Sequence, residues 1–257
     1  MEKMFIWNMI GFIKGEKMKF VTEDSIKIND AGMDGKILPD GLFRIFQEAA
    51  IKHSDSIGFT HRRYTEMNRL WMLHRLSYKL HSDINLYDVI KTETWSRGMQ
   101  RFRGFRDFVL SRDGEPVCTA SSVWLFIDTQ KKRPAKVEPE VPEAYRPVNE
   151  MTNGTVIEDW QPSAPSESSG FFTIQTRLTD FDINAHMNNT VYPAYVFQAF
   201  TELNGAKKDF SEFCIEYSHE LPYGTKEAVV KLEQQGREYI FSVSDGTQTN
   251  AQGFFRV

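Results

Sequence analysis

The chain has few cysteines, no long apolar run and no surplus of positive charge. Its two cysteines, Cys118 and Cys214, are too few for a disulfide framework, and neither has the CxxC spacing of a structural zinc site. The apolar run at residues 4–13 is too short to span a bilayer, which argues against stable membrane insertion. The formal net charge of -4 argues against a nucleic-acid binder, because a surface that follows phosphates needs a cationic surplus. We therefore expect a cytoplasmic protein.

Common catalytic and cofactor motifs are absent as well. The sequence has no Gly-rich phosphate loop, no nucleophile elbow, no HExxH and no His/Cys metal cluster. We therefore expect neither a metal nor a cofactor. Apolar residues, in contrast, are abundant: 40% of the 257 residues are hydrophobic and 20 are Phe, which is enough for one large core or two small ones. This composition suits an enclosed apolar ligand and equally suits ordinary core packing.

The same order of elements occurs twice, on either side of a Pro-rich stretch at residues 134–165. The first copy has helically spaced apolar residues after Asp40, a plausible N-cap, and the second has them between Asn188 and Gly205. Strand-like segments follow each helix, at residues 71–80, 89–95 and 105–111 in the first half and 213–220, 227–233 and 239–243 in the second. An Asp-Gly pair, at 113–114 and at 245–246, marks the last hairpin of each half.

This pattern predicts the α+β class, with one helix covering one face of an antiparallel sheet in each copy. We expect an N-terminal extension at residues 1–17, a first domain at 18–140, a Pro-rich linker at 141–165 and a second domain at 166–257.

The conspicuous polar cluster is the segment TDFDINAHMNN at residues 179–189, just before the second helix. Asp182, Asn184 and His186 alternate in it, so an extended segment would direct all three side chains to one side. A polar stretch before a helix is more often a loop with a cap. The matching stretch of the first half, AGMDGKILPDG, has no histidine. This asymmetry favours a functional role for the second copy.

The segment TDFDINAHMNNTVY resembles the active-site stretch of the acyl-ACP thioesterases of plants and bacteria, which are tandem hotdog-fold enzymes. RLWMLHRLSYKL, FRDFVLSRDGEPVCTASSVW and IEYSHEL are similar to stretches of the same family, and the resemblance covers residues 18–257. It implies two tandem hotdog domains, each an antiparallel sheet wrapped around one long helix. It also implies hydrolysis of fatty acyl-ACP to free fatty acid, which terminates chain elongation. The start of the chain does not look like a plastid transit peptide, so we expect a bacterial protein.

Carried across by position, Asp182, Asn184 and His186 match the family's catalytic stretch, and Glu220 of YSHEL matches its catalytic glutamate on the following strand. Leu221 departs from the pattern, because many plant members have a cysteine there, and a cysteine nucleophile is excluded at this position. We expect Glu220 to be the general base or the nucleophile. Asp182 and His186 would set protonation and orientation, and Asn184 would place the water or the thioester.

Substrate and partner residues follow from the same resemblance. Asn188 and Asn189, at the start of the second helix, would polarise the thioester carbonyl. The first half would hold the acyl chain, with a tunnel lined by Leu42, Phe46, Ala50, Trp71, Leu73 and Trp95. Acyl carrier protein is acidic and should meet a cationic surface. Two basic runs are candidates for that surface: Arg97, Arg101, Arg103 and Arg106, and then Lys131, Lys132, Arg133 and Lys136. Plain core packing and a solvated face are the alternative interpretations of these sets.

Three other functions stay open from the sequence: an acyl-CoA thioesterase, a hotdog hydro-lyase acting on hydroxyacyl thioesters, and a non-enzymatic acyl-binding protein. The intact Asp/Asn/His/Glu set argues against the last of these. A homodimer also stays open as the oligomeric state.

Overall fold

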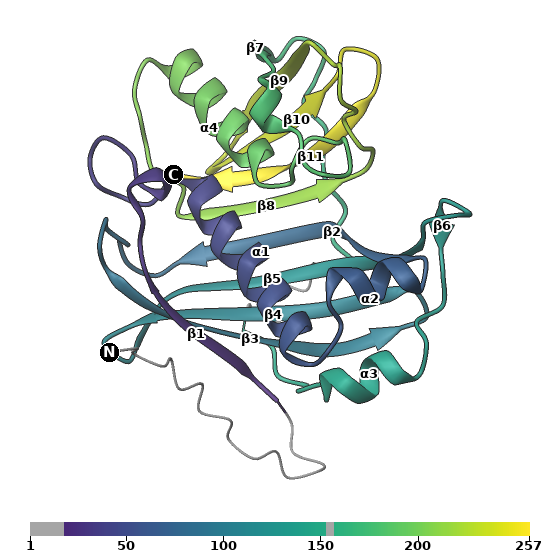
Figure 1. Cartoon of the computed structure of the whole chain (residues 1–257). Helices are drawn as coiled ribbons and strands as arrows, with labels where there is room; N and C mark the ends of the chain where they lie inside the picture. The colour runs from purple at the N-terminus through teal and green to yellow at the C-terminus, as the bar shows by residue number, and fades with distance from the viewer. Residues whose placement is uncertain (1–17, 153–156) are drawn as a thin grey trace, which may run out of the picture.

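The computed structural model describes residues 18–152 and 157–257, which build one extended antiparallel sheet with two long helices on one face (Figure 1). The first half contributes β1 (Phe20–Ser25), β2 (Arg69–Leu80), β3 (Val89–Gln100), β4 (Arg103–Arg112) and β5 (Glu115–Asp128). The second half contributes β7 (Gly170–Gln175), β8 (Glu212–Tyr217), β9 (Glu227–Gln235), β10 (Glu238–Ser244) and β11 (Thr249–Arg256). The short β6 (Arg133–Pro134) pairs with the end of β5. The extension predicted at residues 1–17 lies outside the described residues.

The two halves have the same strand order and meet at a shared centre. The order is β1-β3-β4-β5-β2 in the first half and, continuing outward, β8-β11-β10-β9-β7 in the second. β2 and β8 pair antiparallel, with Ser77 opposite Cys214, so the sheet runs without a break from one half to the other. An ion pair crosses this join, from Arg75 Nη2 to Glu216 Oε2 at 2.6 Å. Pairing the two inner edges removes the exposed strand edge that each half alone would have.

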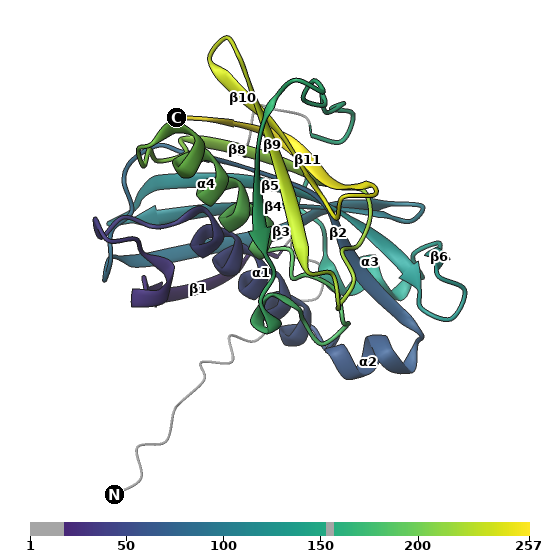
Figure 2. The same ribbon diagram turned by 90° about the horizontal axis from the view of Figure 1, so that it is seen from above.

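The long helices α1 (Pro39–Ser56) and α4 (Val191–Asn204) lie side by side on the same face of the sheet (Figures 1 and 2). Their buried residues recur at helical spacing, which is why an apolar stripe on each helix can cover the sheet. In α1 these residues include Leu42, Phe46, Ala49 and Ala50, and in α4 they include Tyr195, Val196, Ala199 and Phe200. Both predicted helices are confirmed by the model.

One predicted cap is wrong. Asp40 lies inside the first turn of α1, whose N-cap is Leu38, because Pro39 occupies the first helical position, which suits proline. The Asp40 carboxylate instead accepts a hydrogen bond from Arg44 Nη1 at 2.7 Å. At the other helix the prediction holds: Gly205, with φ 67°, is the C-cap of α4.

Both Asp-Gly hairpins are present. Asp113 and Gly114 have φ values of 54° and 87° and form a tight turn between β4 and β5. The second hairpin has a longer loop, in which Asp245 Oδ1 accepts hydrogen bonds from the backbone of Thr247 at 2.9 Å and Gln248 at 3.0 Å. The predicted strands are confirmed, most of them with small changes at their ends. Two differ more: the strand predicted at 89–95 continues to Gln100, and the segment 213–220 stops as a strand at Tyr217.

The Pro-rich stretch is packed against the sheet in its described part. It contains α3 (Glu140–Tyr145), whose residues Val141 and Tyr145 are buried. Further on, Val148 N donates to Ser96 O at 2.8 Å, so the chain follows β3. Ile157 then joins an apolar cluster with Val123 of the first half and Cys214 of the second. The stretch thus crosses from one half to the other over the sheet.

With its two sheet-and-helix units, the molecule has the α+β tandem hotdog architecture that the family resemblance implied.

Candidate active site

The polar segment before α4 folds into a tight turn. Asp182 N donates to His186 O at 2.9 Å and Ala185 N donates to Asp182 O at 3.0 Å, with Ala185 at φ 60°. Asp182 Oδ1 also accepts a hydrogen bond from the backbone N of Asn184 at 2.8 Å, as in an Asx turn. The segment is not extended, so the expectation that alternation directs Asp182, Asn184 and His186 to one side is wrong.

His186 and Glu220 are brought into direct contact by two loops that pair like short strands. His186 forms a β-bridge with Pro222, and Met187 N donates to Leu221 O at 2.9 Å. This pairing places His186 Nε2 3.0 Å from Glu220 Oε2. The two side chains are 35% and 55% exposed, so water can reach both of them. An imidazole and a carboxylate in contact at an accessible position can exchange a proton with a bound water.

Glu220 lies in the loop after β8, not on the strand as predicted, and Asn250 of β11 holds that loop. Asn250 Nδ2 donates to Glu220 O at 3.1 Å, while Asn250 O accepts from the backbone of Ser218 at 2.8 Å and of His219 at 3.2 Å. Asn250 is completely buried. The sequence analysis missed this residue, because its contact joins positions 30 residues apart and only the register of β11 reveals it.

Asp182 and Asn184 form a second pair, separate from His186 and Glu220. Asn184 Nδ2 lies 3.5 Å from Asp182 Oδ2, and Asn184 is exposed. Among the described residues, no side-chain hydrogen bond joins Asp182 or Asn184 to the side chain of His186 or Glu220. Of the four predicted residues, His186 and Glu220 are therefore in contact, whereas Asp182 and Asn184 shape the turn that precedes His186.

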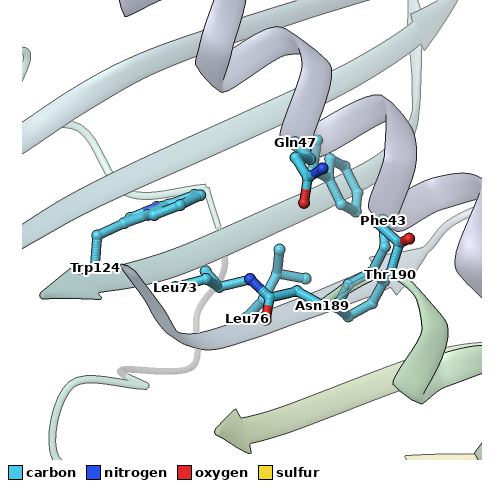
Figure 3. A pocket seen from close by; sticks show the side chains of 8 residues that line it. Phe43, Gln47, Leu73, Leu76, Trp124, Asn189 and Thr190 are labelled. Atoms are coloured by element: carbon cyan, nitrogen blue, oxygen red, sulfur yellow. The ribbon is translucent and has the colours of Figure 1, made fainter. Parts of the chain in front are cut away.

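A small cavity lies where the start of α4 meets the first half (Figure 3). Asn189 and Thr190 close one end, and Figure 3 shows the Gln47 carboxamide directed into the space. The remaining lining is apolar, from α1, β2 and β5: Phe43, Phe46, Leu73, Leu76 and Trp124. Tyr217, next to the loop of Glu220, donates its hydroxyl to Asn189 O at 2.7 Å. The cavity thus begins at a helix N-terminus, whose free N–H groups attract negative charge, and continues into apolar surroundings.

The predicted binding residues are only partly at this cavity. Asn189, Phe46 and Leu73 line it, whereas Asn188 uses its side chain to accept the backbone N–H of Thr190 at 3.0 Å. Ala50 is buried one turn after Phe46 on α1, and Leu42 is buried in the same core. Phe43 and Gln47 were missed, although Phe43 lies three residues before Phe46 and four before Gln47, which are the spacings of neighbours on a helix surface. Leu76, Trp124 and Thr190 were missed because no local pattern marks them.

The two tryptophans predicted to line the tunnel, Trp71 and Trp95, lie elsewhere. Trp95 lies between Thr94 and Ser96 on β3, and the Thr94 hydroxyl is on the α1 side because it contacts Arg106, a neighbour of α1. By alternation Trp95 points to the other face, where its indole N–H donates to Glu150 O at 3.1 Å. Trp71 packs on Phe126 near α2 (His61–Glu66), with ring centroids 4.7 Å apart. Neither ring lines the cavity.

The first half contains the same loop geometry without the same chemistry. Gly32 N donates to Lys36 O at 2.8 Å and Ile37 N donates to Ile84 O at 2.9 Å, as Asp182 and Met187 do in the second half. Lys36 therefore occupies the position of His186, and Asp83 that of Glu220, with Nζ and Oδ2 2.8 Å apart. Hydrogen bonds to Asp83 and Asp209 raise the pKa of Lys36 to about 12. A permanently charged lysine cannot accept a proton near neutral pH, so the site is asymmetric.

Aromatic rings fill the interior of the second half. Phe210 and Phe255 stack with centroids 4.0 Å apart, and Phe200 meets Phe255 edge to face at 5.1 Å. Phe197, Phe213, Tyr239 and Phe241 complete this group.

Neither cysteine is available for chemistry. Cys118 and Cys214 are buried at 0% and 1% exposure, and burial raises the pKa of both thiols. Thiolate formation is disfavoured in such surroundings. Leu221, which follows Glu220, is completely buried as well.

The first basic run does not form a cationic surface. Arg97 pairs with Asp107 at 2.6 Å and with Glu158, Arg103 donates to Glu158 O at 2.9 Å, and Arg106 is buried. Arg101 is exposed. The second run differs, because Lys131, Lys132, Arg133 and Lys136 are all exposed around β6.

Comparison with known proteins shows to which family the chain belongs. The acyl-ACP thioesterase N-terminal domain model matches residues 17–145, and the acyl-ACP thioesterase C-terminal domain model matches residues 163–252. Together the two models cover most of the chain, and their order is that of the two halves of the sheet. The chain belongs to the acyl-ACP thioesterase family.

Curated relatives are chloroplastic plant enzymes. An acyl-[acyl-carrier-protein] hydrolase of Cuphea viscosissima is 26% identical over 208 residues, which cover 76% of this chain and 50% of the relative. A palmitoyl-acyl carrier protein thioesterase of Gossypium hirsutum is 24% identical over 223 residues, covering 82% of this chain and 54% of the relative. The chain thus matches about half the length of these relatives.

Solved structures share the fold. An acyl-ACP thioesterase from Bacteroides thetaiotaomicron matches with a TM-score of 0.80 and 21% identity, covering 93% of this chain and 97% of that one. The 12:0-ACP thioesterase from Umbellularia californica matches with a TM-score of 0.78 and 20% identity, covering 93% and 96%. These likenesses support the tandem hotdog fold.

Proposed function

We propose that this protein hydrolyses the thioester of a fatty acyl group carried by acyl carrier protein and releases the free fatty acid. The observation that carries the proposal is the contact between His186 Nε2 and Glu220 Oε2, 3.0 Å apart. It occurs in the half whose α4 N-terminus opens onto an apolar cavity. Family membership and the names of the plant relatives support the same reaction.

The proposed mechanism places the thioester carbonyl at the start of α4, near Asn189 and Thr190, with the acyl chain directed into the first half. The N–H groups of the first helical turn stabilise the negative charge that develops on the carbonyl oxygen. As general base, Glu220 takes a proton from a water while the oxygen of that water attacks the thioester carbonyl carbon, and His186 Nε2, in contact with Glu220, passes the proton to the leaving sulfur. The carbon–sulfur bond then breaks, the thiol leaves with that proton, and the carboxylic acid is released. If Glu220 is instead the nucleophile, its carboxylate displaces the thiol to form an acyl–glutamyl anhydride, which a water then cleaves to the fatty acid and free Glu220.

Asp182 and Asn184 act indirectly in this mechanism. Their hydrogen bonds shape the turn that presents His186, and the exposed Asn184 side chain can orient the incoming water or phosphopantetheine arm. Asn250 plays the corresponding part for Glu220.

Hydrolysis is tested by incubating the purified protein with acyl-ACP and acyl-CoA of varied chain length and identifying the products by mass spectrometry. A free acid supports the proposal, whereas an unsaturated thioester would identify a hydro-lyase. His186→Ala should lower turnover a hundredfold or more, the usual scale for a general acid-base group. Cys118→Ala and Cys214→Ala are the controls and should retain activity. Activity lost with either cysteine while the fold is kept would overturn the mechanism.

Docking of acyl carrier protein is assigned, within the same proposal, to the exposed run Lys131, Lys132, Arg133 and Lys136. This run lies at the end of the sheet where β8 leads toward Glu220 (Figure 1). The double reversal Lys131→Glu/Lys136→Glu should raise KM for acyl-ACP several-fold, with less effect in high salt and on acyl-CoA. Lys208→Glu, at an exposed lysine after α4, is the matched control. Equal effects on both substrates would contradict this assignment.

A further inference from the structure

Arg106 of β4 is a buried cation without an anionic partner. It is 6% exposed, and its Nη1 donates to His53 Nδ1 at 2.9 Å and to Thr94 Oγ1 at 3.0 Å. Tyr145 also contacts it: the ring lies 5.6 Å from the guanidinium carbon, and the Tyr145 side chain accepts a hydrogen bond from the guanidinium. No Asp or Glu of residues 18–152 and 157–257 forms an ion pair with it. Burying a guanidinium without a counter-charge is costly, so the arrangement is incomplete as it stands.

His53 of α1 has an unsatisfied donor at the same place. It is completely buried and stacks on Phe20, with centroids 5.5 Å apart and an interplanar angle of 6°. Burial and the nearby charge of Arg106 lower the pKa of His53 to about 3, so the ring is neutral at pH 7. Because Nδ1 accepts from Arg106, the ring proton is on Nε2, which has no partner among the described residues. His53 Nε2–H is therefore a buried donor without an acceptor, and Arg106 beside it is a buried positive charge without a counter-charge.

His53 and Arg106 lie beyond the cavity in the direction of α1. Phe46 lines the cavity, and His53 follows seven residues later on the same helix, about 10 Å along its axis. Ala50, a small residue, lies between them. On the sheet, the cavity residue Trp124 donates its indole N–H to Ser122 Oγ at 2.8 Å, and Ser122 Oγ donates to Arg106 O at 3.2 Å.

The figures agree with this placement. Figure 1 shows α1 crossing β2, β5, β4 and β3 in turn, so a chain that follows α1 away from Asn189 approaches β4. Figure 3 shows Phe43 and Gln47 on one side of the start of this path and Leu73 and Trp124 on the other.

We infer that Arg106 and His53 form a binding site for a carboxylate at the distal end of the acyl group, so that the preferred substrates include ω-carboxyacyl thioesters. This inference rests on the proposed function. A carboxylate would accept charge-assisted hydrogen bonds from the guanidinium and a further bond from His53 Nε2–H. A terminal methyl group at the same place would leave the His53 donor unpaired and the Arg106 charge uncompensated, and a site built for hydrogen bonding discriminates strongly against an analogue that lacks the acceptor.

The test compares acyl-ACP substrates of equal length, from eight to sixteen carbons, that end in a methyl group or in a carboxylate. For the lengths that reach the site, wild-type kcat/KM should be at least about tenfold higher with the terminal carboxylate. Arg106→Met should abolish or reverse this preference, and it should fold, because replacing a buried charge by an apolar side chain is often tolerated. His53→Phe, which can keep the stack on Phe20, should reduce the preference in part. Arg103→Met, on the other face of β4, is the control.

A wild-type enzyme that hydrolyses methyl-ended chains as fast as carboxylate-ended ones, with a ratio unaffected by Arg106→Met, would overturn the inference and leave the proposed function intact. Failure to hydrolyse any thioester would overturn the proposed function instead. Binding then decides the inference: calorimetry with non-hydrolysable thioether analogues of acyl-phosphopantetheine should show at least about tenfold tighter binding of the carboxylate-ended probe. Equal binding of the two probes, or no binding of either, would contradict it.

Discussion

Replacing Glu220 by Gln removes the carboxylate but keeps the size of the side chain. The pair with His186 is half exposed, and an ion pair in such a position contributes no more than about 1 kcal/mol to stability. The loop is held independently, by Asn250 and by the backbone pairing of Met187 with Leu221. The variant should therefore fold normally, and any loss of activity measures chemistry.

We expect kcat on acyl-ACP to fall by about 10²- to 10⁴-fold in Glu220→Gln, which is the contribution of a positioned general base. The assay is single-turnover hydrolysis with quantified fatty acid, accompanied by a thermal melt. Asp83→Asn provides an internal control, because Asp83 holds Lys36 at the equivalent position of the first half. That variant should keep full activity. A loss of less than tenfold in Glu220→Gln, or an equal loss in Asp83→Asn, would refute the assignment of the chemistry to the second half.

Three further predictions concern core packing, the pH dependence of stability and the path of the acyl chain. Gly253→Ala should severely destabilise the protein in a urea unfolding measurement, since an added Cβ would collide with Cys214 O and lie 2.7 Å from Phe241 Cζ. Burial and Arg106 lower the pKa of His53 from about 6.5 in the unfolded chain to about 3 in the folded protein. The unfolded state therefore binds a proton first, and stability should fall as pH drops between these values. From pH 7 to 4.5 the wild type should lose about 2–3 kcal/mol more than His53→Phe in urea titrations, and parallel losses would contradict this. Ala50→Phe should shift product chain length toward shorter acids by several methylenes in the assay of released fatty acids. An unchanged distribution from the folded variant would remove Ala50 from the acyl path.

Repeating local patterns made much of the fold predictable. The helical spacing of apolar residues located α1 and α4, and the Asp-Gly pairs located two hairpins. Errors arose where a local rule met a special conformation. Asp40 has the usual chemistry of an N-cap, yet Pro39 starts the helix one residue earlier. Ala185 takes a positive φ and folds the chain back, which defeats the alternation argument for Asp182 and His186.

The remaining errors involve contacts between distant parts of the chain. Trp95 has the size of a tunnel residue, but both faces of β3 are covered, and sequence alternation does not say which face meets α1. Arg97 and Arg103 form a basic run in the sequence but not a basic surface in the structure. Glu158, more than fifty residues later, pairs with Arg97 through its carboxylate and accepts a hydrogen bond from Arg103 through its backbone carbonyl. The sequence analysis named both His186 and Glu220 as catalytic candidates. It did not predict the pairing of their two loops, which brings the two side chains into contact.

The most direct test of the central claim is hydrolysis of a defined acyl-ACP in H₂¹⁸O, with the products identified by mass spectrometry. The account predicts free fatty acid that carries ¹⁸O in its carboxyl group, together with carrier protein bearing a free thiol. Both products should form at least about a hundredfold more slowly when His186 or Glu220 is replaced, and at the wild-type rate when Lys36 or Asp83 is replaced. An unsaturated thioester, or turnover that survives loss of both His186 and Glu220, would contradict the account.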